Sequence, residues 1–201
     1  MLNRINIVAL VAGISTLILI AISLFVPWWQ FIVGNPTVGN PAIATVNVSP
    51  VNVNLALLGD SFTVPLIYAL NIASALTLAS GGITMLIYSL RPNKSYSMKL
   101  LGFGYKKPLY ALIIFVITLV AMSFIVQKIS GFTFPLIGSG ATSLPRNMLP
   151  DGANVSFNVS AAFGWPFYFA IVVAGMCVAA RFYHRKVVAI DATVPPQPAP
   201  Q

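Results

Sequence analysis

Four long apolar stretches dominate the sequence, and none of them contains Lys, Arg, Asp or Glu. They cover about residues 5–26, 65–90, 108–126 and 163–180. Each approaches the ~20 residues that an α-helix needs to cross ~30 Å of hydrocarbon. Because a bilayer core offers no water to backbone groups, stretches that enter it must be helical. The sequence therefore predicts an all-α membrane protein with a four-transmembrane-helix bundle.

The composition agrees with this interpretation. Hydrophobic residues make up 58% of the 201 residues and charged residues only 7%, whereas soluble domains carry roughly a quarter charged residues. The first stretch has a cleaved signal peptide as its alternative interpretation. Its apolar run of 22 residues exceeds the ~7–15 residues of a typical signal core, so we expect an uncleaved anchor.

The basic residues predict an orientation. Nine of the eleven Lys and Arg residues flank both termini and the short loop 91–107. Cytoplasmic loops carry this excess, so we expect a multi-pass protein of the plasma membrane with both termini cytoplasmic and with outer loops 27–64 and 127–162. The same bias accounts for the net charge of +8 without nucleic acid. A secondary interpretation is that basic residues of the short loop bind anionic lipid headgroups: Arg91, Lys94, Lys99, Lys106 and Lys107.

Both outer loops contain alternating apolar and polar residues. Residues 45–55 and 154–160 place Val, Leu or Phe at every second position over most of their length, a pattern typical of half-buried strands. We expect the two loops to form one small extracytoplasmic antiparallel β-sheet, with Pro50 at an edge or a bulge. Three Asn-X-Ser sequons in these loops are candidate glycosylation sites: Asn47, Asn154 and Asn158.

Ionisable side chains are rare in the predicted outer loops, where only Asp60, Lys128, Arg146 and Asp151 occur. A surface with few titrating groups keeps its charge over a wide pH range. An acidic exterior, as for an acidophile, would explain this scarcity, and a generally low-charge composition is the alternative explanation.

Small residues recur along the predicted helices. In the second helix they are spaced by four residues, which lets another helix approach closely. We expect packing within the bundle, with contact between copies as the alternative. Asn71 should face the bundle interior, because an unpaired amide is costly in hydrocarbon. The packing candidates are Ala9, Gly13, Ala69, Ala73, Thr77, Gly81, Ala170, Ala174 and Gly175. The aromatic residues expected at the outer membrane interface are Trp28, Trp29 and Trp165.

Reactive groups are scarce in the sequence. It holds one histidine, His184, one cysteine, Cys177, and three aspartates without any glutamate. Catalytic and metal sites usually need several such groups together. Gly59-Asp60-Ser61 is similar to a hydrolase motif, but the only histidine is predicted on the other side of the membrane. We therefore expect no enzyme activity, no metal and no cofactor.

The domain prediction is one transmembrane domain over residues 1–186 and a proline-rich, disordered cytoplasmic tail over residues 187–201. Four spans, inside termini, an outer sheet and Pro27-Trp28-Trp29-Gln30 after the first helix resemble the claudin and peripheral-myelin-protein-like tetraspan group. The resemblance implies an architecture, with Trp29 as the matching aromatic. The loop cysteine pair of that group has no counterpart here.

These features predict a non-enzymatic tetraspan protein that acts through lateral or extracytoplasmic protein contacts, as an accessory or structural subunit of a membrane assembly. Its expected partners are membrane lipids and either other membrane proteins or further copies of itself. One alternative is a small channel or solute carrier with Asn71, Ser74 and Thr77 along the path. Another is a cofactor-free subunit of a respiratory or other redox membrane complex, with the cofactors on partner chains.

Overall fold

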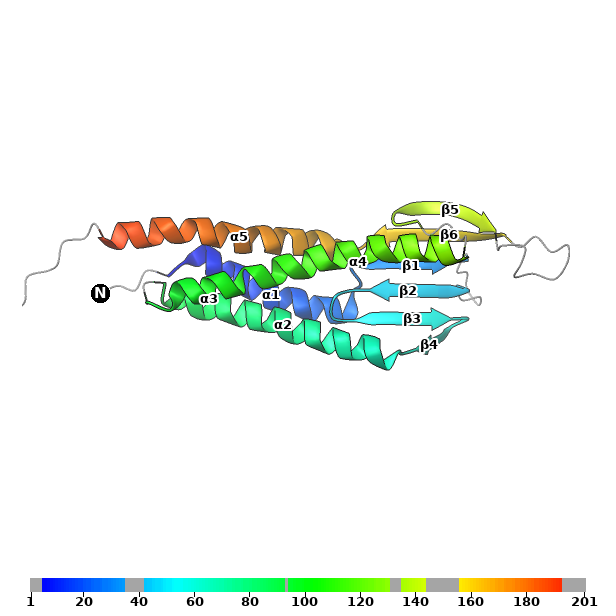
Figure 1. Ribbon diagram of the computed structural model, residues 1–201, viewed down its shortest axis with the longest axis horizontal. Coiled ribbons are helices and arrows are strands. Elements are labelled where there is room, and N and C mark those ends of the chain that lie inside the picture. The colour runs from blue at the N-terminus through cyan, green and yellow to red at the C-terminus, as the bar shows by residue number, and fades with distance from the viewer. Residues whose placement is uncertain (1–4, 35–41, 93, 131–134, 144–155, 193–201) are drawn as a thin grey trace, which may run out of the picture. The chain divides into compact units, whose positions relative to one another are not determined.

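The computed structural model describes residues 5–34, 42–92, 94–130, 135–143 and 156–192 (Figure 1). Among these residues, four helical segments are long and apolar enough to cross a membrane, which confirms that part of the prediction. The helices are α1 (Ile7–Phe25), α2 (Pro65–Leu90), α3 (Ser97–Gly104), α4 (Lys106–Ser130) and α5 (Trp165–Ala192). The strands are β1 (Trp29–Val33), β2 (Ala44–Val48), β3 (Val53–Leu57), β4 (Asp60–Phe62), β5 (Gly138–Ser143) and β6 (Ser156–Phe163).

The helices differ from the prediction in three places. Helix α3 occupies part of the predicted loop 91–107. The next helix was predicted from about Pro108, but α4 begins at Lys106, so that Pro108 is its third residue, where a missing N–H costs no intrahelical bond. Helix α5 continues to Ala192, although a disordered tail was expected from residue 187. Residues 187–192 contain no Gly or Pro that would stop the helix, and the rest of the tail lies outside the described residues.

Residues 21–75 and 111–169 belong to one compact unit, which we call the sheet unit. Its described strands form one six-stranded sheet in the order β4-β3-β2-β1-β6-β5, and every neighbouring pair is antiparallel. Strand β1 pairs with β2 from the first loop and with β6 from the second. The prediction that both loops join in one antiparallel sheet is therefore confirmed, whereas β1, β4 and β5 were not predicted.

Side chains alternate between the two faces of this sheet. On one face Trp29 and Phe31 of β1 are buried, and so are Val159 and Ala161 of β6. In register, Phe31 lies opposite Ala161 on one side and opposite Val46 on the other. The second face carries the intervening Asn, Gln, Ser and Thr side chains. A sheet with one buried and one polar face is the expected result of period-two alternation.

The connection between β2 and β3 holds the end of α1. Pro50 lies in this connection and not at an edge or a bulge, which corrects the prediction. The Ser49 hydroxyl donates to the carbonyl of Ser23 at 2.8 Å, and the Asn52 amide donates to the carbonyl of Leu24 at 2.7 Å. The last carbonyls of a helix have no intrahelical partner, so the turn supplies the missing donors.

The turn between β3 and β4 explains the Gly59-Asp60-Ser61 sequence. Leu58 and Gly59 have φ values of 51° and 92°, and two left-handed residues in a row are typical of a type I′ hairpin. Glycine adopts this conformation without steric cost. The sequence therefore forms a tight turn into β4, and its glycine has a structural role.

Aromatic rings form the centre of the sheet unit. Trp28 contacts Phe115 edge-on with ring centroids 5.1 Å apart, and Phe163 stacks on Phe167 at 4.3 Å. The Trp28 indole donates to the Ser23 hydroxyl at 2.7 Å, and the Trp29 indole donates to the carbonyl of Leu136 at 2.8 Å. Both indoles are only 1% exposed, whereas Trp165 is 56% exposed. Trp28 and Trp29, which were expected at the membrane interface, are therefore buried in the core of the sheet unit.

The second compact unit, which we call the helical unit, comprises residues 1–20, 76–110 and 170–201. Its helices approach each other most closely at glycines. A Cβ on Gly13 of α1 would lie 2.9 Å from the Leu86 side chain and 3.0 Å from the carbonyl of Gly82 on α2. A Cβ on Gly81 of α2 would lie 2.7 Å from that of Lys107. Only a missing side chain permits these crossings.

The predicted packing residues divide into two groups. Ala9, Gly13, Gly81, Ala170 and Ala174 are buried, and Asn71 is 9% exposed. The other four are exposed and make no internal seam: Ala69, Ala73, Thr77 and Gly175. The reason is that a row of residues spaced by four drifts by about 40° around a helix at each step. In α2 this row turns inward only at its last member, Gly81.

Candidate functional site

The polar face of the sheet is the most distinctive surface of the sheet unit. Gln30, Asn47 and Asn54 lie directly opposite one another on β1, β2 and β3, and they form a row of three carboxamides. A neighbouring row contains Thr45 of β2 and Ser160 of β6, each paired with Ile32. These groups donate and accept hydrogen bonds without carrying charge. The face therefore suits neutral polar partners and not ionic ones.

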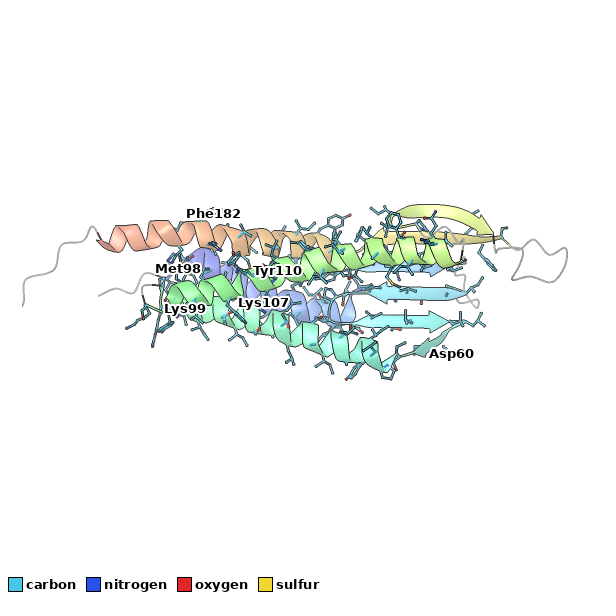
Figure 2. The ribbon with its side chains drawn as sticks, in the orientation of Figure 1. Asp60, Met98, Lys99, Lys107, Tyr110 and Phe182 are labelled. Atoms are coloured by element: carbon cyan, nitrogen blue, oxygen red, sulfur yellow. The ribbon has the colours of Figure 1, made fainter. Side chains whose placement is uncertain are left out.

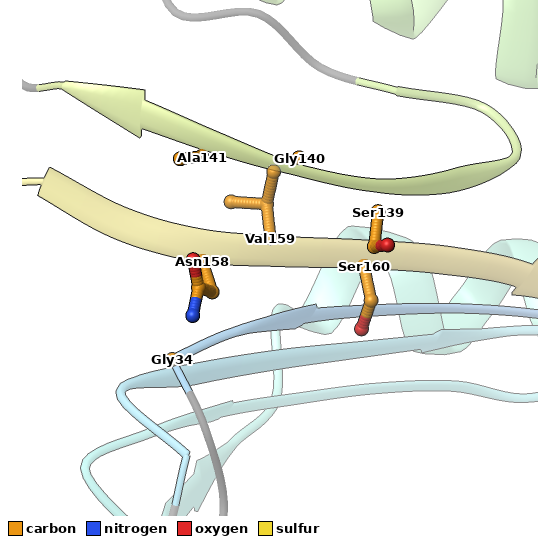
Figure 3. A pocket seen from close by; sticks show the side chains of 7 residues that line it. All are labelled: Gly34, Ser139, Gly140, Ala141, Asn158, Val159 and Ser160. Carbon is orange, nitrogen blue, oxygen red and sulfur yellow. The ribbon is translucent and has the colours of Figure 1, made fainter.

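A groove of about 350 Å³ opens beside β5 and β6 (Figure 3). The labelled Asn158 and Ser160 side chains leave β6 on one side, and Val159 leaves it on the other. Its remaining lining is small, consisting of Gly34, Ser139, Gly140 and Ala141. Its volume is at the small end of the ~300–1,000 Å³ typical of small-molecule sites. None of the described residues that line it is charged.

The two edges of the sheet differ strongly. Strand β4 has three residues and carries Asp60, so its shortness and its charge both discourage further pairing. Strand β5 has six residues, Gly-Ser-Gly-Ala-Thr-Ser, and it contains neither a charge nor a proline. In the described part of the chain, β5 is the outermost strand on its side. It offers an open row of backbone donors and acceptors.

A buried polar network lies in the helical unit. The Asn6 amide donates to the Tyr88 hydroxyl at 3.0 Å, and this hydroxyl lies 2.7 Å from Nδ1 of His184. The backbone N–H of Ala9 donates to Oδ1 of Asn6 at 3.1 Å, which fixes the orientation of the amide. A tyrosine hydroxyl can donate one hydrogen bond and accept others, so the Tyr88 hydroxyl bonds to Asn6 and His184 at once. The network joins α2 and α5 to the residue that precedes α1.

The single histidine and the single cysteine both lie inside the helical unit. His184, predicted at the cytoplasmic end of the last span, is only 8% exposed. Cys177 is fully buried, with its Sγ 3.9 Å from the Thr16 hydroxyl. Among the described residues, no three His, Cys, Asp or Glu side chains gather where they could hold a metal ion.

Basic and apolar side chains share the surface around α3. Figure 2 labels Met98 and Lys99 on α3 and Lys107 on α4. Met98 is 55% exposed, and the Lys107 ammonium lies 4.5 Å from the centre of the Phe103 ring. Residues 91–107 contain five basic residues and no acidic one: Arg91, Lys94, Lys99, Lys106 and Lys107. A mixed basic and apolar surface suits the headgroup region of an anionic bilayer.

Two hydroxyls of α2 bond to the preceding turn of their own helix. The Ser80 hydroxyl donates to the carbonyl of Thr77 at 2.7 Å, and the Thr84 hydroxyl donates to the carbonyl of Ser80 at 2.8 Å. Serine and threonine in apolar helices commonly make such bonds to the preceding turn.

The sequons have different environments. Asn158 is exposed on β6, whereas Asn47 on β2 is partly buried and lines a small cavity of about 70 Å³. Asn154 lies outside the described residues, and so do Arg146 and Asp151 of the predicted low-charge surface.

Comparison with protein-family models gives no match, and comparison with curated proteins gives none either.

Proposed function

We propose that this protein is a non-enzymatic, multi-pass protein of the plasma membrane that assembles laterally with further copies of itself. Its six-stranded sheet lies outside the cell and its termini lie in the cytoplasm. The observation that carries the proposal is the open edge of β5, which has six residues and neither a charge nor a proline. Natural proteins usually protect such an edge, so an unprotected one favours pairing with another strand.

A second copy of the chain is the occupant that this edge fits best. When a sheet edge selects a foreign peptide, specificity comes from pockets for alternate side chains. Strand β5 offers Gly, Ala and small hydroxyl residues instead, and the space next to a Cβ on Gly138 or Gly140 is empty within 4 Å. A membrane also holds copies in one plane and one orientation, which raises their effective concentration. Identical subunits most often pair around a twofold axis.

The charge distribution supports the proposed orientation. Within the described residues, Lys94, Lys99, Lys106 and Arg181 belong to the helical unit and are exposed. The sheet unit carries Asp60 and Lys128 as its described charges. An excess of basic residues is typical of the cytoplasmic side. The tetraspan resemblance remains a proposal of architecture alone.

Cysteine cross-linking tests the assembly. We expect Ser139→Cys or Ala141→Cys on β5 to form covalent dimers in native membranes, because side chains on paired strands come within ~5 Å. The native Cys177 is buried and gives a low background. Ala162→Cys is the matched control, since it is exposed on β6, one strand in from the edge. A strictly monomeric particle in mild detergent, without a β5 cross-link in membranes, would contradict the proposal.

A further inference from the structure

The geometry points to Asn158 as an N-glycosylation site, and it assigns a purely structural role to Asn47, although both begin the same Asn-Val-Ser tripeptide. This inference rests on the outer position of the six-stranded sheet in the proposed function. It does not depend on pairing through β5.

Asn158 has room for a sugar in the folded protein. Its side chain is exposed on the polar face of β6 and borders the groove of about 350 Å³ (Figure 3). The nearest parts of the lining are Gly34 and Gly140, which have no side chain, and Ala141, which has a single methyl group. Ser139 and Ser160 supply hydroxyls at the same groove, and hydroxyls are natural partners for sugar hydroxyls. A glycan can therefore leave Asn158 without displacing protein atoms.

Asn47 has no such room. Its Oδ1 atom is buried, and its side chain lines the cavity of about 70 Å³ together with Asn52 and Asn54. The Ser49 of its sequon is 2% exposed, and its hydroxyl caps α1 through the carbonyl of Ser23. An oligosaccharide on Asn47 would have to push the β2–β3 connection away from the helix end. The fold thus exposes the asparagine of one sequon and partly buries that of the other, although the two tripeptides are identical.

The reaction requires a lipid-linked oligosaccharide as the donor and a membrane oligosaccharyltransferase as the catalyst. Nδ2 of Asn158 forms a bond to C1 of the first sugar while the bond between C1 and the lipid phosphate oxygen breaks. The lipid phosphate leaves with the electron pair, and Nδ2 gives up one proton to a base of the transferase. Because the backbone of β6 is paired with β1 and β5 in the fold, transfer takes place before the sheet closes. A sugar on Asn158 is compatible with the closed sheet, whereas a chain modified at Asn47 could not bring the β2–β3 connection onto the end of α1 and is absent from the folded protein.

Mass spectrometry of the full chain from its native membranes tests the inference. We expect peptides that contain Asn158 to carry the added mass of an oligosaccharide. Ser160→Ala should abolish this mass while Ser160→Thr keeps it, because the sequon accepts either hydroxyl residue. These variants leave the Asn158 side chain in place. Asn154→Gln removes the neighbouring sequon, so that any sugar still found on these peptides must be on Asn158. Asn47→Gln is the matched control that should leave the modification unchanged.

Three outcomes would overturn the inference: no sugar on the protein, sugar on Asn154 alone, or sugar on Asn47. If the β5 cross-link forms while Asn158 is unmodified, the glycosylation inference fails and the proposed assembly stands. If Asn158 is modified and no cross-link forms, the assembly fails and the modification stands.

Discussion

In the helical unit the helices cross at glycines, whereas in the sheet unit aromatic rings fill the space beside the sheet. Gly13 and Gly81 bring helix backbones together, and Trp28 and Phe167 fill the space beside the sheet. Helices in lipid gain little from burying apolar side chains, so they associate through close backbone approach. A sheet that faces water on one side gains from burying large rings on the other. The two units therefore use two kinds of packing, which are close backbone approach between helices and burial of large rings beside a sheet.

Removing a ring from the sheet unit should have the largest effect on stability. Trp28→Ala deletes a side chain that is 1% exposed and leaves Phe115 and Phe167 facing a cavity. Losses of about 3–5 kcal/mol are typical of such changes. Thermal unfolding in mild detergent measures the loss. Trp165→Ala, at a residue that is 56% exposed, is the control and should change little; equal losses at both positions would contradict the aromatic core.

Adding a methyl group to a helix crossing should have the next largest effect. Gly13→Ala places a Cβ 3.0 Å from the carbonyl of Gly82, and overpacking of this kind costs about 1–3 kcal/mol. Gly175→Ala is the control, because nothing lies within 4 Å of its Cβ position. There the better helix propensity of alanine should stabilise the protein by about 0.5–1 kcal/mol. Effects of the same sign would show that the α1–α2 crossing is looser than described.

Opening the buried polar network should have a moderate effect. Tyr88→Phe removes the hydroxyl between Asn6 and His184, and interhelical hydrogen bonds in membranes contribute about 0.6–2 kcal/mol. Tyr110→Phe, at a residue that is 51% exposed, provides the control in the same unit. The unfolding temperature of both variants in detergent is the readout. If the Tyr88 variant were as stable as the Tyr110 variant, the network would not contribute to the stability of the fold.

Neutralising single lysines around α3 should have the smallest effect. Each basic residue near headgroups contributes about 1 kcal/mol of attraction to anionic lipid, or about a fivefold change in affinity. Lys99→Gln and Lys106→Gln should each reduce phosphatidylserine retention measured by native mass spectrometry. Lys128→Gln, in the last turn of α4, is the control. An equal reduction by all three variants would contradict a specific headgroup surface at α3.

Local patterns predicted the four long helical segments and part of the sheet, but not α3. The absence of charge over about 20 residues is a strong local signal, and so is the alternation at residues 45–55 and 154–160. The sequence of strand β5, Gly-Ser-Gly-Ala-Thr-Ser, contains neither a long apolar stretch nor an alternation of apolar and polar residues. It is a strand because it pairs with β6 along its whole length. Strand β1 follows α1 so closely that Trp28 and Trp29 read as membrane-interface aromatics, although both are buried.

The buried polar network joins residues that lie far apart in the sequence. Asn6 and Tyr88 are 82 residues apart, and Tyr88 and His184 are 96 apart. A pattern within one helix cannot reveal such a network, because each residue taken alone looks like a polar helix end. The small-residue row of α2 failed for a related reason. Four-residue spacing marks one face only over short distances, and Ala69 and Gly81 lie on different sides of the helix.

Labelling from outside the cell tests the central claim most directly. The claim is that the six-stranded sheet and helix α3 lie on opposite sides of the membrane. Asp60→Cys marks β4, at the edge of the sheet opposite β5, and Lys99→Cys marks α3; a membrane-impermeant maleimide is applied to intact cells before and after permeabilisation. The account predicts that Cys at 60 reacts in intact cells and that Cys at 99 reacts only after permeabilisation. Reaction of both positions in intact cells, or of neither, would contradict it.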